Sequence, residues 1–209
     1  MTVLTPALGA RATGAADLRV AGVALFALSA QFLTVIMLAA SMAPDYDVSG
    51  AAISDLGTID ETALLFNLSL LVVGGLNLLA GLLLFGWHRS AWTLGVFLTA
   101  AIGAIGAGVF PLDAGGPHGL FALIAFIAFN VEPLAIARHI TGPMRAISLL
   151  AGAVGLVFVV LMAIGDAGNA AAFGPIGHGG TERMIVYPAM LWMLAFGGWL
   201  MAARSADEG

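Results

Sequence analysis

The sequence contains no cysteine and no lysine, and charged residues of every kind make up only 9% of its 209 positions. The absence of cysteine excludes disulfide bonds, thiolate metal sites and cysteine nucleophiles. Without lysine, the seven basic side chains are all arginine and are scattered along the chain. They form no basic patch that could neutralise a phosphate backbone, which argues against a nucleic-acid partner. An ordinary soluble domain has about 25% charged residues, so this chain has too few to cover a folded surface in water.

Hydrophobic residues make up 61% of the sequence, and the mean hydropathy is +1.04. Six apolar runs have about the ~20 residues with which a helix crosses a bilayer. We therefore predict an all-α, polytopic membrane protein in which residues 20–204 form a bundle of six transmembrane helices between tails at 1–19 and 205–209. The predicted spans are 20–42, 63–87, 91–112, 118–137, 146–165 and 182–203.

The first of these runs could also be a signal peptide, because Ser41-Met42-Ala43 resembles a cleavage site of small residues. Its apolar core is longer than the ~7–15 residues of a signal sequence. We therefore expect a span that is retained in the mature protein.

The arginine positions predict the orientation of the bundle. If six spans alternate, all but one of the arginines fall on one side of the membrane, namely Arg11, Arg19, Arg89, Arg138, Arg145 and Arg204. Only Arg183 falls on the other side. Short cytoplasmic loops collect the excess of basic residues, so we expect both termini in the cytoplasm. The polar residues at the opposite, extracytoplasmic face are then Asp55, Asp113, His118, Asp166, His178, Glu182 and Arg183.

The turn at residues 110–119 contains two prolines and three glycines, so the chain must stop and reverse there. Asp113 and His118 lie in this turn and are the candidate catalytic residues. A carboxylate beside an imidazole can orient the ring and make it a general base. The alternative is an ordinary polar turn in which both side chains are solvated.

Glu182 and Arg183 open the predicted last span, with Thr181 as its expected N-cap. A glutamate in a first helical turn is stabilised by the helix dipole, whereas an arginine there is not. Arg183 therefore needs an anionic partner. That partner is either an internal carboxylate (Asp55, Asp113 or Asp166) or the phosphate or carboxylate of a ligand.

Two further sites at this face have weaker support. Ser54 beside Asp55 could be a nucleophile, but no Gly-x-Ser-x-Gly surrounds it, and serine and aspartate are also ordinary turn residues. A metal ion is possible but not favoured, because the available ligand types follow no recognised spacing. The residues of that metal site would be His118, His178, Asp113 and Glu182.

Four polar residues lie inside the predicted spans: Asn67, Asn77, Asn130 and Glu132. Glu132 is the one carboxylate well inside a span, and such residues are functional candidates by default. The alternatives are that it pairs with Arg138 or Arg89, or is protonated. We expect Asn67 and Asn77 to form hydrogen bonds between helices rather than to line a path.

Three short motifs resemble the pattern of domain-of-unknown-function family 998, a group of small prokaryotic membrane proteins with about six spans. The motifs are Ile53-Ser54-Asp55-Leu56-Gly57, then Phe110-Pro111-Leu112-Asp113 with His118, and Gly180-Thr181-Glu182-Arg183. The resemblance covers nearly the whole chain from the first span onward. It implies a shared polar site at Ser54, Asp55, Asp113, His118, Glu182 and Arg183, and the plasma membrane of a prokaryote as the location. It implies no activity.

Three functions remain open. The leading hypothesis is a binding or accessory protein whose outer cavity holds a small polar molecule or a lipid headgroup. The second is a membrane-embedded hydrolase or transferase that acts at the outer leaflet, with His118 as base and Asp113 orienting it. The third is a small proton-coupled transporter that uses Glu132, although no internal repeat supports it. The sequence predicts neither a cofactor nor an oligomeric state.

Overall fold

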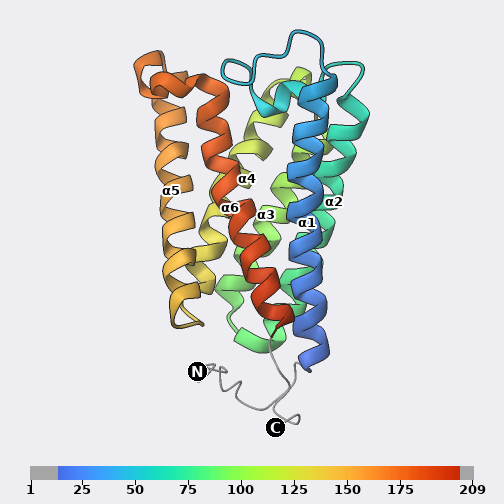
Figure 1. Ribbon diagram of the computed structural model, residues 1–209, viewed down its shortest axis with the longest axis vertical. Helices are drawn as coiled ribbons and strands as arrows, with labels where there is room; N and C mark the ends of the chain where they lie inside the picture. Colours follow the sequence, from blue (N-terminus) through green and yellow to red (C-terminus); the bar gives the residue numbers. More distant parts are fainter. Residues whose placement is uncertain (1–13, 203–209) are drawn as a thin grey trace.

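The computed structural model describes residues 14–202, and within that range it is helical without strands. The long helices are α1 (Ala15–Met42), α2 (Ala63–His88), α3 (Ala91–Val109), α4 (Gly116–Ile136), α5 (Pro143–Asp166) and α6 (Gly177–Met201) (Figure 1). Three short 3-10 helices lie in the connections: η1 (Ile53–Gly57), η2 (Leu112–Ala114) and η3 (Ala170–Ile176). The all-α prediction is confirmed.

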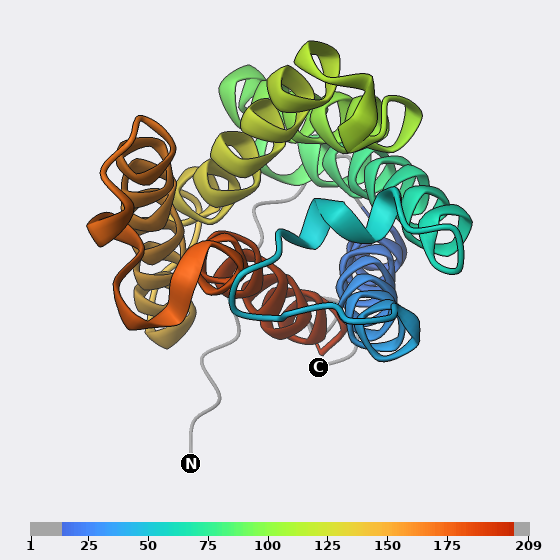
Figure 2. The ribbon, with the colours of Figure 1, turned by 90° about the horizontal axis from the view of Figure 1, so that it is seen from above.

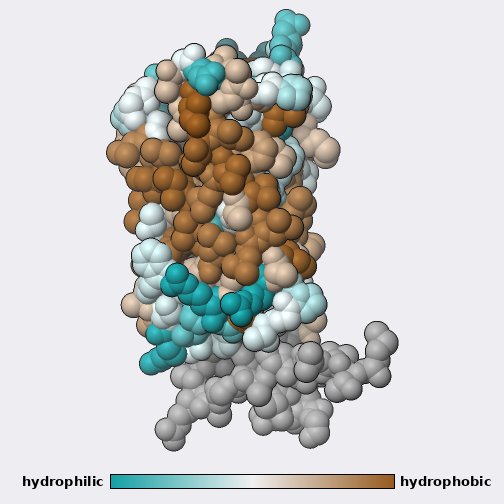
Figure 3. Space-filling model, turned by 90° about the vertical axis from the view of Figure 1, so that its left-hand side faces the viewer, coloured by the Kyte–Doolittle hydropathy of each residue, from teal (hydrophilic) through white to brown (hydrophobic). Residues whose placement is uncertain are grey.

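All six long helices are long and apolar enough to cross a membrane. Large apolar side chains project outward along them, among them Leu64, Leu150 and Ile102. The face that includes α5 shows an apolar band across the middle of the molecule, with polar residues toward the ends (Figure 3). Because water would penalise such a band, its natural surroundings are lipid. The chain is a multi-pass membrane protein.

The helices form a ring in the order of the sequence, as the view along the bundle shows (Figure 2). Each helix packs against the helix before it and the helix after it, and α6 closes the ring against α1. The connection between α1 and α2, residues 43–62, crosses over one end of the ring and carries η1 with it (Figure 2). This connection brings residues from the first third of the chain over α6.

The two ends of the bundle differ. One end, called the loop end here, consists of the connections at 43–62, 110–115 and 167–176 (Figure 1). The opposite end holds the start of α1, the end of α6 and the short connections at 89–90 and 137–142. The arginines of the described residues follow this division: Arg19, Arg89, Arg138 and Arg145 belong to the opposite end and Arg183 to the loop end. Arg11, Arg204 and most of the predicted tails lie outside the described residues, so the cytoplasmic location of the termini stays a prediction.

Several span boundaries differ from those predicted: α1 begins at Ala15 rather than at 20, α5 begins at Pro143 rather than at 146, and two further differences affect the candidate site. Helix α3 ends at Val109 rather than at 112, because Pro111 disfavours a helical conformation at the residue before it. Helix α6 begins at Gly177 rather than at 182, so Thr181 is not an N-cap and its hydroxyl donates to the Gly177 carbonyl at 2.9 Å. Arg183 therefore lies beyond the first turn of α6, where the helix dipole does not disfavour an arginine.

Close packing explains why the glycine-rich stretch at 177–180 is helical. A Cβ atom on Gly179 would collide with the carbonyl oxygens of Val48 and Ala51. Glycine therefore lets the 43–62 connection lie directly on α6, and this tertiary contact outweighs the low helix propensity of glycine.

Candidate functional site

Arg183 fixes the 43–62 connection to α6. Its Nη1 donates to the carbonyl oxygens of Val48 and Gly179, both at 2.9 Å, and its Nη2 donates to the Tyr46 hydroxyl at 2.8 Å. The Tyr46 hydroxyl in turn donates to the Ala52 carbonyl at 2.7 Å. Burial raises the pKa of Tyr46, so its hydroxyl keeps its proton and can hold both bonds. The guanidinium thus ties one loop to one helix.

The predicted carboxylate partners of Arg183 are wrong. Within residues 14–202, none of the three predicted carboxylates forms an ion pair with Arg183, and Asp166 pairs with His178 instead. Asp55 instead accepts from the backbone N–H of Ala52 at 2.7 Å, and Asp113 is exposed on η2. Backbone carbonyls satisfy the guanidinium in their place, and Arg183 lines neither of the two cavities described below.

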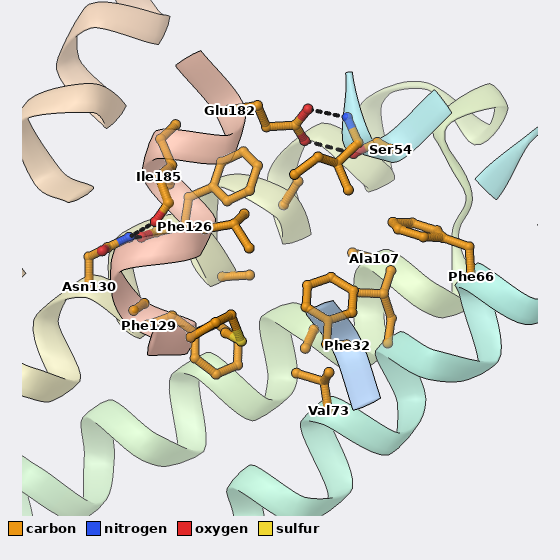
Figure 4. Close-up of a pocket in the computed structure, with 18 of the residues that line it drawn as sticks. Phe32, Ser54, Phe66, Val73, Ala107, Phe126, Phe129, Asn130, Glu182 and Ile185 are labelled. Atoms are coloured by element: carbon orange, nitrogen blue, oxygen red, sulfur yellow. Dashed lines mark hydrogen bonds between the residues drawn. The ribbon is translucent and has the colours of Figure 1, made fainter. Parts of the chain in front are cut away.

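Glu182 lies one residue before Arg183 but contacts a later part of the 43–62 connection, namely η1. The Glu182 carboxylate accepts from the backbone N–H of Ile53 and from the Ser54 hydroxyl, the latter at 3.2 Å (Figure 4). Only 2% of Glu182 is exposed. The 3-10 turn of η1 presents both donors to the carboxylate, so η1 and α6 together build this part of the site.

His118 comes from the first turn of α4 and is only 3% exposed. Its Nδ1 lies 2.8 Å from the carbonyl oxygen of Phe110. Since a carbonyl can only accept, Nδ1 carries the hydrogen, and in the neutral ring Nε2 is an acceptor. No group in residues 14–202 bonds to this buried Nε2. The expected Asp113–His118 pair is therefore wrong: the Phe110 carbonyl, not Asp113, orients the ring.

Ser54, His118 and Glu182, called the loop-end cluster here, line two adjacent cavities. The first has a volume of about 60 Å³ and lies inside the ring, among apolar side chains such as Phe32, Phe66 and Phe129 (Figure 4). The second is a cleft of about 390 Å³ between η1, α4, α5 and α6. Of the six residues predicted to share a site, these three converge, whereas Asp55, Asp113 and Arg183 line neither cavity.

The walls of the cleft are mostly apolar. They include Leu123 and Phe126 on α4, Val159 and Met162 on α5, and Ile185 on α6. No signal in the sequence marks these residues, because an apolar residue that faces a cleft has the same sequence pattern as one that faces lipid.

His178 and Asp166 line the cleft beside the loop-end cluster, with Nε2 of His178 3.3 Å from Oδ1 of Asp166. The side chains are 35% and 55% exposed, so this pair lies nearer to solvent than Glu182. Nowhere in the described part of the chain do three His, Asp or Glu side chains come together so that they could hold a metal ion. The predicted metal set of His118, His178, Asp113 and Glu182 is thus not assembled.

Glu132 lies away from the cleft and is fully buried. Its Oε1 accepts from Nδ2 of Asn77 on α2 at 2.7 Å, and the same Nδ2 also lies 3.1 Å from the Phe97 carbonyl on α3. Its partner is therefore an amide, not Arg138 or Arg89. The prediction of a hydrogen bond between helices is confirmed for Asn77.

The other two asparagines also hold elements together. Asn130 on α4 donates to the Ile185 carbonyl on α6 at 3.0 Å (Figure 4). Its amide fills the space beside Gly155 on α5, where a Cβ atom would collide with it. Asn67 on α2 donates to the Gly57 carbonyl of η1 at 2.9 Å.

The sequence model of a family described as "Protein of unknown function (DUF998)" matches residues 26–199. This stretch includes all three members of the loop-end cluster, and the match confirms the resemblance seen in the short motifs. No curated protein and no solved structure matches the chain.

Proposed function

The chain belongs to the DUF998 family of proteins of unknown function, and from that premise we propose that it is a membrane protein that binds a small amphiphilic molecule. The molecule occupies the cleft between α4, α5 and α6. Its polar end meets Ser54, His118 and Glu182, and its apolar part lies against the walls formed by α4 and α5.

The observation that carries this proposal is the buried Nε2 of His118, which has no partner among the described residues and belongs to a side chain that lines the cleft. Leaving a buried acceptor unpaired costs about 1–3 kcal/mol. A ligand or a water molecule in the cleft removes that cost. The cleft of about 390 Å³ also lies within the roughly 300–1,000 Å³ typical of small-molecule pockets.

The apolar walls support an amphiphile over a fully polar ligand. Around the loop-end cluster, the cleft is lined by Leu123, Phe126, Val159 and Ile185. Leu123 is 48% exposed on the outside of α4, where lipid surrounds the bundle. A molecule with an alkyl chain buries apolar area against such walls, whereas a small polar solute does not.

We further infer that the loop end faces the outside of a prokaryotic plasma membrane. The support is the distribution of arginine, six positions against one, and the rule that basic residues accumulate in cytoplasmic loops. The ligand then reaches the cleft from the outer leaflet or from the medium.

The hydrolase or transferase alternative retains one supporting observation. Ser54 donates to the Glu182 carboxylate, and a hydroxyl bonded to a base is the arrangement of an activated nucleophile. Turnover of a fatty-acyl ester that Ser54→Ala abolishes would favour this function over binding alone. The transporter alternative has less support, because Glu132 lines neither cavity.

The binding proposal can be tested by photolabelling in phosphatidylcholine nanodiscs. Two ten-carbon probes that carry a diazirine, one ending in a hydroxyl and one in a carboxylate, are irradiated with the protein and the labelled residues are mapped by mass spectrometry. We expect at least one probe to label Leu123 on α4 and Val159 on α5, which both line the cleft.

Ala122→Phe serves as the blocking variant, because Ala122 lines both cavities and a phenyl ring there fills the space. The matched control is Ile102→Phe, which adds a ring on the lipid-facing side of α3. Cleft labelling that falls in Ala122→Phe and persists in Ile102→Phe supports the proposal. Labelling confined to lipid-facing positions such as Ile102, with no change in Ala122→Phe, overturns it.

A further inference from the structure

Resting on that proposed function, we infer the chemical class of the ligand: its polar end is a hydrogen-bond donor, a hydroxyl or an amine, and not an anionic phosphate or carboxylate. The groups that the protein presents to the cleft are acceptors, and the guanidinium that could bind an anion is used elsewhere.

His118 provides the first acceptor. Its Nδ1–H is committed to the Phe110 carbonyl at 2.8 Å, which leaves Nε2 with a lone pair in the neutral ring. This nitrogen is buried and has no partner in the described part of the chain, although the side chain lines both cavities. An O–H or N–H group can satisfy it, whereas the oxygen of an ester, an ether or a carboxylate cannot.

Ser54 and Glu182 extend this acceptor surface. The single hydroxyl hydrogen of Ser54 is directed to Oε1 of Glu182, so the two lone pairs of the Ser54 oxygen can accept from the cleft. Both oxygens of Glu182 accept from η1, one from Ser54 and one from the Ile53 N–H. Each carboxylate oxygen has a second lone pair, so Glu182 can accept again from a ligand that lies beside it.

The charges around the cleft also disfavour an anion. Among residues 14–202, the cleft is lined by the carboxyl groups of Glu182 and Asp166 and by no arginine. The nearest guanidinium in sequence, Arg183, donates to Val48, Gly179 and Tyr46 on the far side of the connection. His178 lines the cleft, but its Nε2 faces Asp166. An anionic headgroup would meet like charge without a compensating cation.

The test is a competition against the photoprobes in nanodiscs of phosphatidylcholine, whose headgroup has no N–H or O–H of its own. The competitors share a ten-carbon chain and differ only at the end: decan-1-ol, decylamine, decanoate and 1-methoxydecane. At equal concentration in the bilayer, we expect decan-1-ol or decylamine to reduce cleft labelling about fivefold to tenfold more than 1-methoxydecane, which is what one added hydrogen bond supplies.

The two donor competitors, decan-1-ol and decylamine, distinguish the two possible donor groups of the ligand. A preference for decan-1-ol indicates a hydroxyl headgroup, and a preference for decylamine indicates an ammonium group that also uses the two carboxyl groups. Decanoate or 1-methoxydecane competing as well as the donors overturns the inference and leaves the binding proposal standing. Absence of cleft labelling by every probe overturns the binding proposal itself, so the two failures can be told apart.

His118→Phe tests the residue that carries the inference. A phenyl ring retains the aromatic shape but removes the acceptor, so labelling by the alkyl chain should persist while the advantage of the donor competitors disappears. The matched control is His139→Phe at the opposite end of the bundle, where His139 bonds to Thr93 and lines neither cavity. Should His118→Phe fail to fold, the comparison of the four competitors on the unchanged protein still decides the question.

Discussion

Two buried glutamates of this bundle are satisfied in different ways. Glu182 near the loop end accepts from Ile53 and Ser54 and lines both cavities. Glu132 accepts only from Asn77, its Oε2 has no partner among the described residues, and it lines neither cavity. Burial of a carboxyl group does not therefore mark a binding site by itself. What distinguishes Glu182 is the adjacent space, into which solvent or a ligand can enter.

The largest effect that this comparison predicts concerns the Asn77–Glu132 pair. Asn77→Leu removes the donor to Glu132 in surroundings that admit no replacement, so we expect a loss of about 1–3 kcal/mol. Thermal unfolding of the purified protein in detergent measures it. The double variant Asn77→Leu with Glu132→Leu removes both polar groups and should lose less than the sum of the two single losses.

Additive losses in this cycle would contradict the coupling between Asn77 and Glu132. An equal loss of ligand labelling in Asn77→Leu and in the loop-end variants would erase the distinction between the two glutamates. It would show that the Asn77–Glu132 pair also belongs to the binding machinery.

The fold could be predicted from the sequence because its determinants are local. A span is a run of apolar residues, and the positions of six such runs and of the arginines between them are visible in the chain. For Ser54, His118 and Glu182, the sequence predicts that they lie at the same end of the bundle but not that they converge on one cleft. The alternation of spans indicates which end a residue occupies, but not which side of a connection it faces.

The partners of Arg183 and Glu132 were mispredicted for two different reasons. Arg183 binds backbone carbonyls, and every residue has one, so no side-chain pattern in the sequence indicates such a partner. Glu132 is separated from Asn77 by 55 positions, so their contact depends on how two helices that are not neighbours in the sequence pack in the bundle. Opposite charges in the sequence therefore do not indicate the partners where amides and carbonyls pair the buried polar groups.

A smaller effect is expected at the loop end. Ser54→Ala removes one donor to Glu182, but the Ile53 N–H remains and the adjacent cleft can admit water, so we expect a loss of only about 0.5–1.5 kcal/mol in thermal unfolding. Labelling of the cleft by the hydroxyl probe should fall more clearly than stability does. Ser69→Ala is the matched control, since Ser69 is a buried serine that bonds within α2 and lines neither cavity. A stability loss in Ser54→Ala as large as that of Asn77→Leu would mean that the loop end is packed as tightly as the interior.

The smallest expected effect on stability comes from single cysteine substitutions that report which end of the bundle faces outward. Single cysteines at Asp47 and Ala114, both exposed at the loop end, should react with an impermeant thiol reagent added outside intact cells, and one at Arg138 should not. The natural chain has no cysteine, so the background is clean. Reaction at Arg138→Cys alone would reverse the orientation and place the cleft on the cytoplasmic side.

The bonds of Arg183 affect how mutational data on this protein should be interpreted. Its guanidinium connects the stretch from Tyr46 to Ala51 with α6, and Ser54 follows that stretch by only a few residues. We therefore expect a substitution of Arg183 to displace Ser54 from Glu182 and to abolish the proposed binding, although Arg183 lines neither cavity. In a survey of variants by ligand binding, Arg183 would therefore be grouped with the residues that contact the ligand. It can be told apart because every ligand would be lost to the same degree, whereas substitution of His118 would change which ligand is preferred.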